Sequence, residues 1–111
     1  MDDLLLITTP LPDEYKIVKI LGLVTGLTAR TRGVGGRFIA GIESMVGGEV
    51  SAFTSEMEKA RFEAIERLKQ KAVQLGANAI VGIDIETSEV FVGTVLVSAT
   101  GTAMVVENRK K

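Results

Sequence analysis

The strongest constraint on the fold is the passage from a long amphipathic helix into a strand through a single glycine, Gly76. Ser55 and Glu58 have the form of a capping box, so we predict a helix from Glu56 to Leu75, with a start a few residues earlier as the alternative. Glu63 and Arg67 are four residues apart, a favourable pair that we interpret as part of a solvated face. Gly76 is placed to end the helix in a left-handed conformation. Apolar residues recur along one stripe of this helix, at Met57, Ala60, Ala64, Leu68 and Ala72.

The residues after Gly76 predict a strand over positions 80–87. Val81, Ile83 and Ile85 alternate with Asp84 and Glu86, as in a strand of which one face is buried. We therefore expect the three aliphatic side chains to share one face of a sheet.

Strands and a second helix are predicted on both sides of this central unit. Tyr15 to Ala29 is rich in β-branched residues and predicts a long strand, in which Gly22 and Gly26 indicate bulges or close backbone contacts. Residues 30–36 are rich in Gly and Arg, which predicts a loop, and the apolar spacing over Phe38 to Met45 predicts a short helix that ends at Gly47 and Gly48.

Two closing strands complete the predicted fold. A turn at 89–93 is followed by strands over 94–100 and 102–106, with Gly101 as a bulge or bend between them. The order of elements indicates an α+β domain over residues 1–111, with a mainly antiparallel sheet and one long and one short helix on one face.

Composition excludes several classes of function. The formal net charge is −1, so the chain lacks the basic field of a nucleic-acid-binding protein. It has no His and no Cys, which leaves hydroxyl nucleophiles without their usual base and removes the usual ligands of soft metals. We therefore assign no catalytic residue, no metal site and no cofactor, although a Ser-Lys arrangement stays open. The acidic start and the lack of a long apolar run predict a cytoplasmic protein without a membrane span.

Six short pieces of the chain occur in the same order in a known family. They are Thr8-Thr9-Pro10, Val24-Thr25-Gly26, Val46-Gly47-Gly48-Glu49, Ala60-Arg61, Leu75-Gly76-Ala77-Asn78-Ala79 and Gly101-Thr102-Ala103. Through them the chain resembles the uncharacterised YbjQ-like proteins, sometimes labelled as heavy-metal-binding domains. The resemblance covers nearly the whole chain. It implies a compact subunit similar to the dodecin-like fold, assembled as a homopentamer, and it brings no established activity.

The heavy-metal label finds little support in the residues of this chain. The soft donors present are the thioethers of Met1, Met45, Met57 and Met104, which we interpret as core side chains. Hard cations are a separate possibility, because Asp84 and Glu86 lie on one face of the predicted strand. The alternative for these two carboxylates is an ordinary solvent-facing strand edge, and we prefer it.

The loop from Arg30 to Arg37 is the best candidate for a ligand contact. Arg30, Arg32 and Arg37 could hold an anion at the start of the short helix, but the motif lacks the ending of a P-loop. The alternative for these arginines is salt bridges to a neighbouring subunit, and we prefer it. Glu49 and Asn78 are further candidates, with a turn and local backbone hydrogen bonds as the respective alternatives.

The apolar content predicts self-association. Mean hydropathy is +0.29, and Phe62, Ile65 and Val73 widen the apolar surface of the long helix beyond its main stripe. Identical chains usually cover such surface by closed cyclic symmetry. We therefore expect a homo-oligomeric binding or scaffold protein, with an enzyme or a ligand-binding protein whose site forms between subunits as the alternative.

Overall fold

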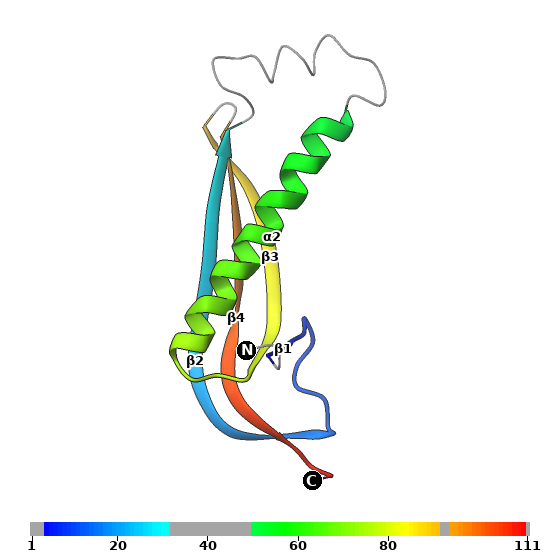
Figure 1. Cartoon of the computed structure of the whole chain (residues 1–111), viewed down its shortest axis with the longest axis vertical. Coiled ribbons are helices and arrows are strands. Elements are labelled where there is room, and N and C mark those ends of the chain that lie inside the picture. The colour runs from blue at the N-terminus through cyan, green and yellow to red at the C-terminus, as the bar shows by residue number, and fades with distance from the viewer. Residues whose placement is uncertain (1–3, 32–49, 92–93, 111) are drawn as a thin grey trace.

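The computed structural model describes residues 4–31, 50–91 and 94–110, which form one sheet and one long helix (Figure 1). The predicted α+β class, with a mainly antiparallel sheet and a long helix on one face, is confirmed. The predicted short helix over 38–45 lies outside the described residues. In chain order the elements are β1 (Leu5–Leu6), β2 (Tyr15–Thr31), α2 (Val50–Gln74), β3 (Ala79–Phe91) and β4 (Thr94–Asn108).

The sheet has the strand order β1-β3-β4-β2. Strand β4 lies in the centre and pairs antiparallel with both β2 and β3. The short β1 pairs parallel with the start of β3, where Leu5 lies opposite Ala79 and Leu6 opposite Ile80. Strand β2 therefore forms one edge of the described sheet over its whole length.

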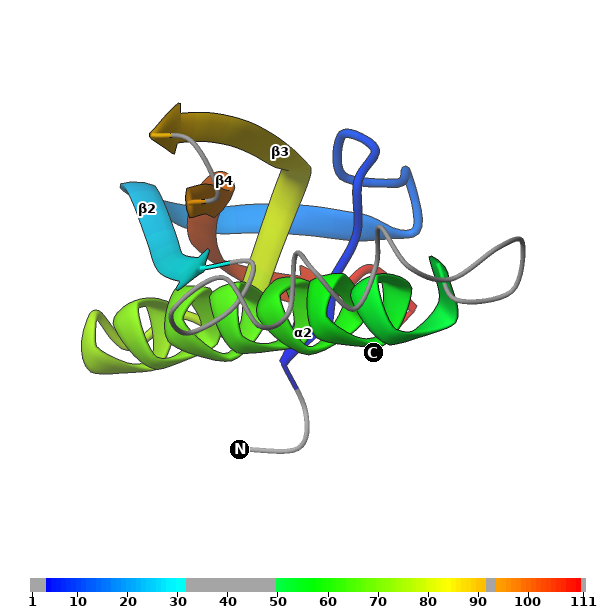
Figure 2. The ribbon, with the colours of Figure 1, turned by 90° about the horizontal axis from the view of Figure 1, so that it is seen from above.

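Helix α2 packs on one side of this sheet (Figure 2) and buries the predicted stripe. Ala60, Ala64, Leu68 and Ala72 are fully buried. The capping box at Ser55 was wrong, because α2 begins at Val50, the earlier start that the sequence left open, and Ser55 lies inside the helix. A Ser or Thr inside a helix costs only a few tenths of a kcal/mol relative to good helix formers, and packing against a sheet readily overrides such a local signal.

The helix ends as the sequence predicts. Gly76 has a φ of 89°, and its N–H donates to the carbonyl oxygen of Val73 at 2.9 Å. The N–H of Ala77 donates to the carbonyl oxygen of Ala72 at 3.0 Å. These two bonds form a Schellman motif, which satisfies the last carbonyl groups of α2 and turns the chain into β3.

A bulge in β3 overturns the predicted strand alternation. The register shifts between Val81 and Asp84, and Gly82 has a φ of 62°. As a result Val81 and Ile83 face opposite sides of the sheet: Ile83 joins the helix-side core, and Val81 joins a second cluster on the other face. The N-terminal segment binds the bulge, because the N–H of Gly82 donates to the carbonyl oxygen of Thr9 at 3.0 Å.

Strand β4 is continuous through Gly101, so the predicted break between 94–100 and 102–106 was wrong. The irregularity lies on the neighbouring strand, where the β3 bulge faces Gly101. A Cβ at Gly101 would lie 2.6 Å from the Cγ2 atom of Ile80, so this position needs a glycine for space rather than for a bend.

The two faces of the sheet are covered unequally. The helix side holds the main core, including Leu68, Ile80 and Val97. On the other side, the N-terminal segment covers a small cluster of Ala79, Val81, Met104 and Val106 with Leu5, Ile7, Leu11 and Tyr15. Within the described residues, no helix combines the length and the apolar character that crossing a bilayer requires.

Candidate functional site

A group of polar side chains joins β2 to α2 beside the helix-side core. Thr28 and Arg30 of β2 both bind the carboxylate of Glu63: the Thr28 hydroxyl donates to Oε1, and Arg30 Nη2 lies 3.2 Å from the same atom. Arg30 Nη1 also lies 3.4 Å from Oε1 of Glu56. Arg67 Nη2 lies 3.5 Å from Oε2 of Glu63, so this carboxylate has partners on both elements. We call Thr28, Arg30, Glu56, Glu63 and Arg67 the Glu63 cluster.

Strand and helix periodicities together assemble this cluster. Gly26, Thr28 and Arg30 alternate along β2 on the side that faces the helix. Glu56 and Glu63 are seven residues apart on α2, close to two turns, so both reach the same strand. A Cβ at Gly26 would lie 2.1 Å from the carbonyl oxygen of Ala64. The helix backbone therefore lies directly on the strand next to the cluster.

Glu63 is the titratable group that this arrangement perturbs most clearly. The hydrogen bond from Thr28 is the main cause that lowers the pKa of Glu63, and the charges of Arg67 and Arg30 lower it further. Partial desolvation of the carboxyl acts in the opposite direction but is outweighed. Glu63 is therefore held in its ionised form, as an acceptor and a counter-ion rather than as a proton donor.

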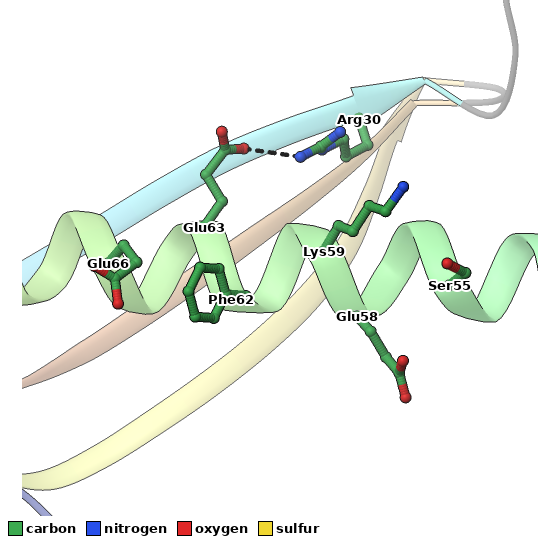
Figure 3. Close-up of a pocket in the computed structure, with 7 residues that line it drawn as sticks. All are labelled: Arg30, Ser55, Glu58, Lys59, Phe62, Glu63 and Glu66. Atoms are coloured by element: carbon green, nitrogen blue, oxygen red, sulfur yellow. Dashed lines mark hydrogen bonds and ion pairs between the residues drawn. The ribbon is translucent and has the colours of Figure 1, made fainter.

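A shallow hollow of ≈ 630 Å³ lies on one side of the cluster (Figure 3). In Figure 3 Glu63 points toward Arg30, whereas Glu58 points away from it. Phe62, which is 65% exposed, stands between Glu58 and Glu66 on the helix. The hollow is lined by Arg30, Ser55, Glu58, Lys59, Phe62, Glu63 and Glu66.

The hollow next to Phe62 offers charged and aromatic groups that a ligand could contact. Its charged groups are largely paired, since Lys59 lies 3.8 Å from Glu56 and Lys69 lies 3.1 Å from Glu66. The hydroxyl of Ser55 has no hydrogen bond to a base within the part of the chain that the structure describes. An aromatic face between carboxylates can contact an apolar or cationic group of a ligand.

A second hollow, of ≈ 380 Å³, lies on the other side of the cluster. It is lined by Thr25, Gly26 and Leu27 of β2 and by Arg67, Gln70, Lys71 and Gln74 of α2. Arg67 belongs both to this hollow and to the Glu63 cluster, and its Nη1 donates to the carbonyl oxygen of Leu27 at 2.6 Å.

The structure does not gather the residues that the sequence put forward as ligand contacts. Arg30 lies in the Glu63 cluster, while Arg32, Arg37 and Glu49 lie outside the described residues. Asn78 lies at the far end of the sheet: its amide donates to the carbonyl oxygen of Val106 at 3.0 Å and accepts from the N–H of Val106 at 2.8 Å. Arg30 lies opposite Val95 of β4, whereas Asn78 binds Val106 of the same strand. Val95 and Val106 are eleven residues apart, or roughly 35 Å along an extended strand.

The sequence did not predict that the members of the Glu63 cluster come together. The sequence predicted Glu63 and Arg67 as an isolated pair on a solvated face. The ion pair is confirmed, but it is part of the larger cluster. The signal for the larger cluster was a Thr and an Arg two residues apart on the strand, together with acids seven residues apart on the helix. That signal becomes useful only once the helix is known to lie on this strand.

Comparisons with known proteins agree on one family. A family model described as "Putative heavy-metal-binding" (YbjQ) matches residues 4–107. A UPF0145 protein of Methanoregula boonei is 41% identical over 106 residues, covering 96% of this chain and 88% of that protein. One of Thermoplasma acidophilum is 37% identical over 108 residues, covering 97% and 91%. A crystal structure from Pediococcus pentosaceus, of unknown function and assigned to the DUF74 family, has 18% identity and a TM-score of 0.64, covering 94% of this chain and 98% of that one.

The described residues do not fit the heavy metal in the family's description. Met57 packs against the helix-side core, and Met104 is 4% exposed in the cluster on the opposite face. The two thioethers therefore cannot share one ion. Residues 4–31, 50–91 and 94–110 contain no group of three or more Asp, Glu, His or Cys side chains that could hold a metal. Asp84 and Glu86 are exposed on β3 and lie opposite Thr100 and Ser98.

Proposed function

We propose that this chain, which belongs to the YbjQ-like family, is a non-catalytic binding or scaffold subunit that assembles with copies of itself in the cytoplasm. A pentamer is the form that the family resemblance implies. The absence of Cys fits a reducing compartment. The two features that support self-assembly are the open edge of β2 and the apolar side chains that this strand exposes.

The apolar surface of β2 is the observation that carries the proposal. Five large side chains of this strand are about half exposed or more: Ile17 (48%), Val18 (52%), Ile20 (61%), Leu23 (75%) and Leu27 (49%). Most soluble monomers do not leave a contiguous apolar patch of this kind in water. The occupant that fits best is a second copy of the chain, because a strand edge can accept another strand through its backbone as well as its side chains.

The shape of the subunit supports the same conclusion. The radius of gyration is 17.6 Å and the extents are 57 × 23 × 20 Å. A compact domain of this length has a radius of gyration of roughly 13 Å. An elongated subunit buries less apolar surface by itself than a compact domain does. Packing against neighbouring subunits supplies the missing burial.

Light scattering coupled to size-exclusion chromatography tests the proposal. We expect the wild-type chain at micromolar concentration to give several times the chain mass of 11.8 kDa. Leu23→Asp should lower that mass, because it places a charge on the proposed interface. Phe62→Asp makes the same kind of change on the apolar surface of α2 that the sequence also predicts to take part in self-association, and it distinguishes the two surfaces. A folded wild-type monomer, or a Phe62→Asp variant that dissociates while Leu23→Asp does not, would contradict the proposed interface.

The hollow next to Phe62 favours a second candidate, a small-ligand protein or enzyme whose site is completed by another subunit. Its volume of ≈ 630 Å³ is in the range of ligand sites. Absorption spectra of freshly purified protein distinguish the two candidates. The chain has one Tyr and no Trp, so a band above 300 nm would come from a retained ligand. Native mass spectrometry would then give the mass of that ligand and the number of subunits.

A further inference from the structure

The second hollow differs from the first in the charge of its lining. Both of its charged residues, Arg67 and Lys71, are basic, and no Asp or Glu lines it. Gln70 and Gln74 add two side-chain amides. The hollow next to Phe62, by contrast, is lined by three glutamates. A lining of this composition favours an anion and disfavours a cation.

The polar groups of this hollow are free to bind a ligand. In the described ranges, the side chains of Thr25, Gln70, Lys71 and Gln74 have no hydrogen bond or ion pair with another residue. Arg67, by contrast, is held in place by the Leu27 carbonyl oxygen at 2.6 Å and by Glu63 at 3.5 Å. The hollow therefore combines one fixed guanidinium with an unpaired ammonium group one helical turn away.

The walls of the hollow are closely packed where the two elements meet. Gly26 allows the backbone of α2 to lie directly on β2, because a Cβ there would be 2.4 Å from the backbone nitrogen of Leu68. Arg67 directly precedes Leu68 in α2, and Lys71 follows Leu68 by three residues. Little reorganisation would be required of the backbone when a ligand binds, which lowers the entropic cost of binding.

We propose that this hollow binds a small oxyanion, the phosphate or carboxylate group of a metabolite, between Lys71 and Arg67. Lys71 contributes the main charge-assisted hydrogen bond, because much of the donor capacity of Arg67 is already used within the chain. Gln70 and Gln74 supply the neutral donors that orient the group. The volume of ≈ 380 Å³ accommodates a small organic acid or phosphate. Every residue of this site comes from one subunit, although Leu27 also belongs to the apolar surface of β2 that the proposed assembly covers.

Isothermal titration calorimetry at constant ionic strength tests this site with pyrophosphate and with citrate as probes. Lys71→Gln removes the free ammonium group and should weaken binding of the preferred probe by about tenfold, the effect of losing one charge-assisted hydrogen bond. Lys69→Gln is the matched control: it removes the same charge from the same helix, but Lys69 pairs with Glu66 and does not line the hollow. That variant should change the affinity less than twofold.

Backbone NMR spectra locate the bound probe. We expect saturable shifts centred on the amides of Thr25, Leu27, Gln70 and Lys71. Binding of pyrophosphate alone would assign the site to phosphates, and binding of citrate alone would assign it to carboxylates. Saturation by neither probe, equal weakening by both lysine variants, or shifts centred elsewhere would overturn the proposal.

Discussion

Gly26 of β2 and Ala64 of α2 are in direct backbone contact: a Cβ built on Gly26 would lie 2.1 Å from the Ala64 carbonyl oxygen. This contact sets the distance between helix and sheet. It also places Arg67, one turn further along α2, against the edge of β2, where it donates to Leu27. The Glu63 cluster and both hollows lie next to this contact, so their geometry depends on the distance that it sets between β2 and α2.

Gly26→Ala should destabilise the fold by about 2 kcal/mol, because backbone atoms of the helix cannot move aside as a flexible side chain can. Gly82→Ala is the comparison. At Gly82 nothing lies within 4 Å of the added Cβ, and only its φ of 62° resists the change, at a cost of about 1 kcal/mol. Urea unfolding at one protein concentration measures both. A loss at Gly26 no larger than the loss at Gly82 would contradict the close contact.

Gly76→Val should destabilise the fold by about 1 kcal/mol or more, because a β-branched residue is poorly suited to the left-handed φ of 89°. Gly76→Asn should cost less, since Asn tolerates this conformation and the two Schellman hydrogen bonds can persist. Denaturation midpoints of the two variants check the ranking. Equal midpoints for Val and Asn would contradict the role assigned to this turn.

Acid should weaken the attachment of α2 to β2 through Glu63. The pKa of Glu63 is lower in the folded than in the unfolded state, where it is about 4.5. Ionised Glu63 therefore stabilises the fold fully at pH values above about 4.5, and this contribution is lost as the pH falls through the folded-state pKa. Thr28→Val removes the main cause of the shift without removing a titratable group. We expect it to destabilise the protein more at pH 7 than at pH 3.

Unfolding curves at pH 7, 5 and 3 test this dependence. Glu107→Gln is a suitable control, because its ion pair with Lys16 is largely exposed, at 61% and 55%, and exposed pairs contribute little to stability. A Thr28→Val penalty that is the same at all three pH values would show that the hydrogen bond does not bias the titration of Glu63.

Soft metals should bind this chain weakly despite the description of its family. It has neither Cys nor His, and Met57 and Met104 lie on opposite sides of the sheet. Elemental analysis of purified protein should find no stoichiometric zinc, copper or cadmium. A calorimetric titration that gives sub-micromolar affinity with one site per subunit would refute this expectation.

Local patterns in the sequence were sufficient for much of the fold. The stripe from Met57 to Ala72 identified the face of α2 that packs on the sheet, and Gly76 identified the end of that helix. Gly22 and Gly26 were correctly interpreted as a bulge and a close contact: the β2 register shifts next to Gly22, and α2 lies on Gly26. These features are readable because each depends on residues that are near one another in the chain, or on the absence of a side chain.

Tertiary contacts decided what the sequence patterns could not. The side on which Val81 packs depends on a bulge in β3 that the N-terminal segment binds through Thr9, more than seventy positions earlier. Continuity of β4 through Gly101 depends on the same bulge. The Glu63 cluster exists only because β2 and α2, joined through residues 32–49, lie side by side. Periodicity determines which face of each element is apolar, whereas the polar groups that meet across two elements are set by how those elements pack.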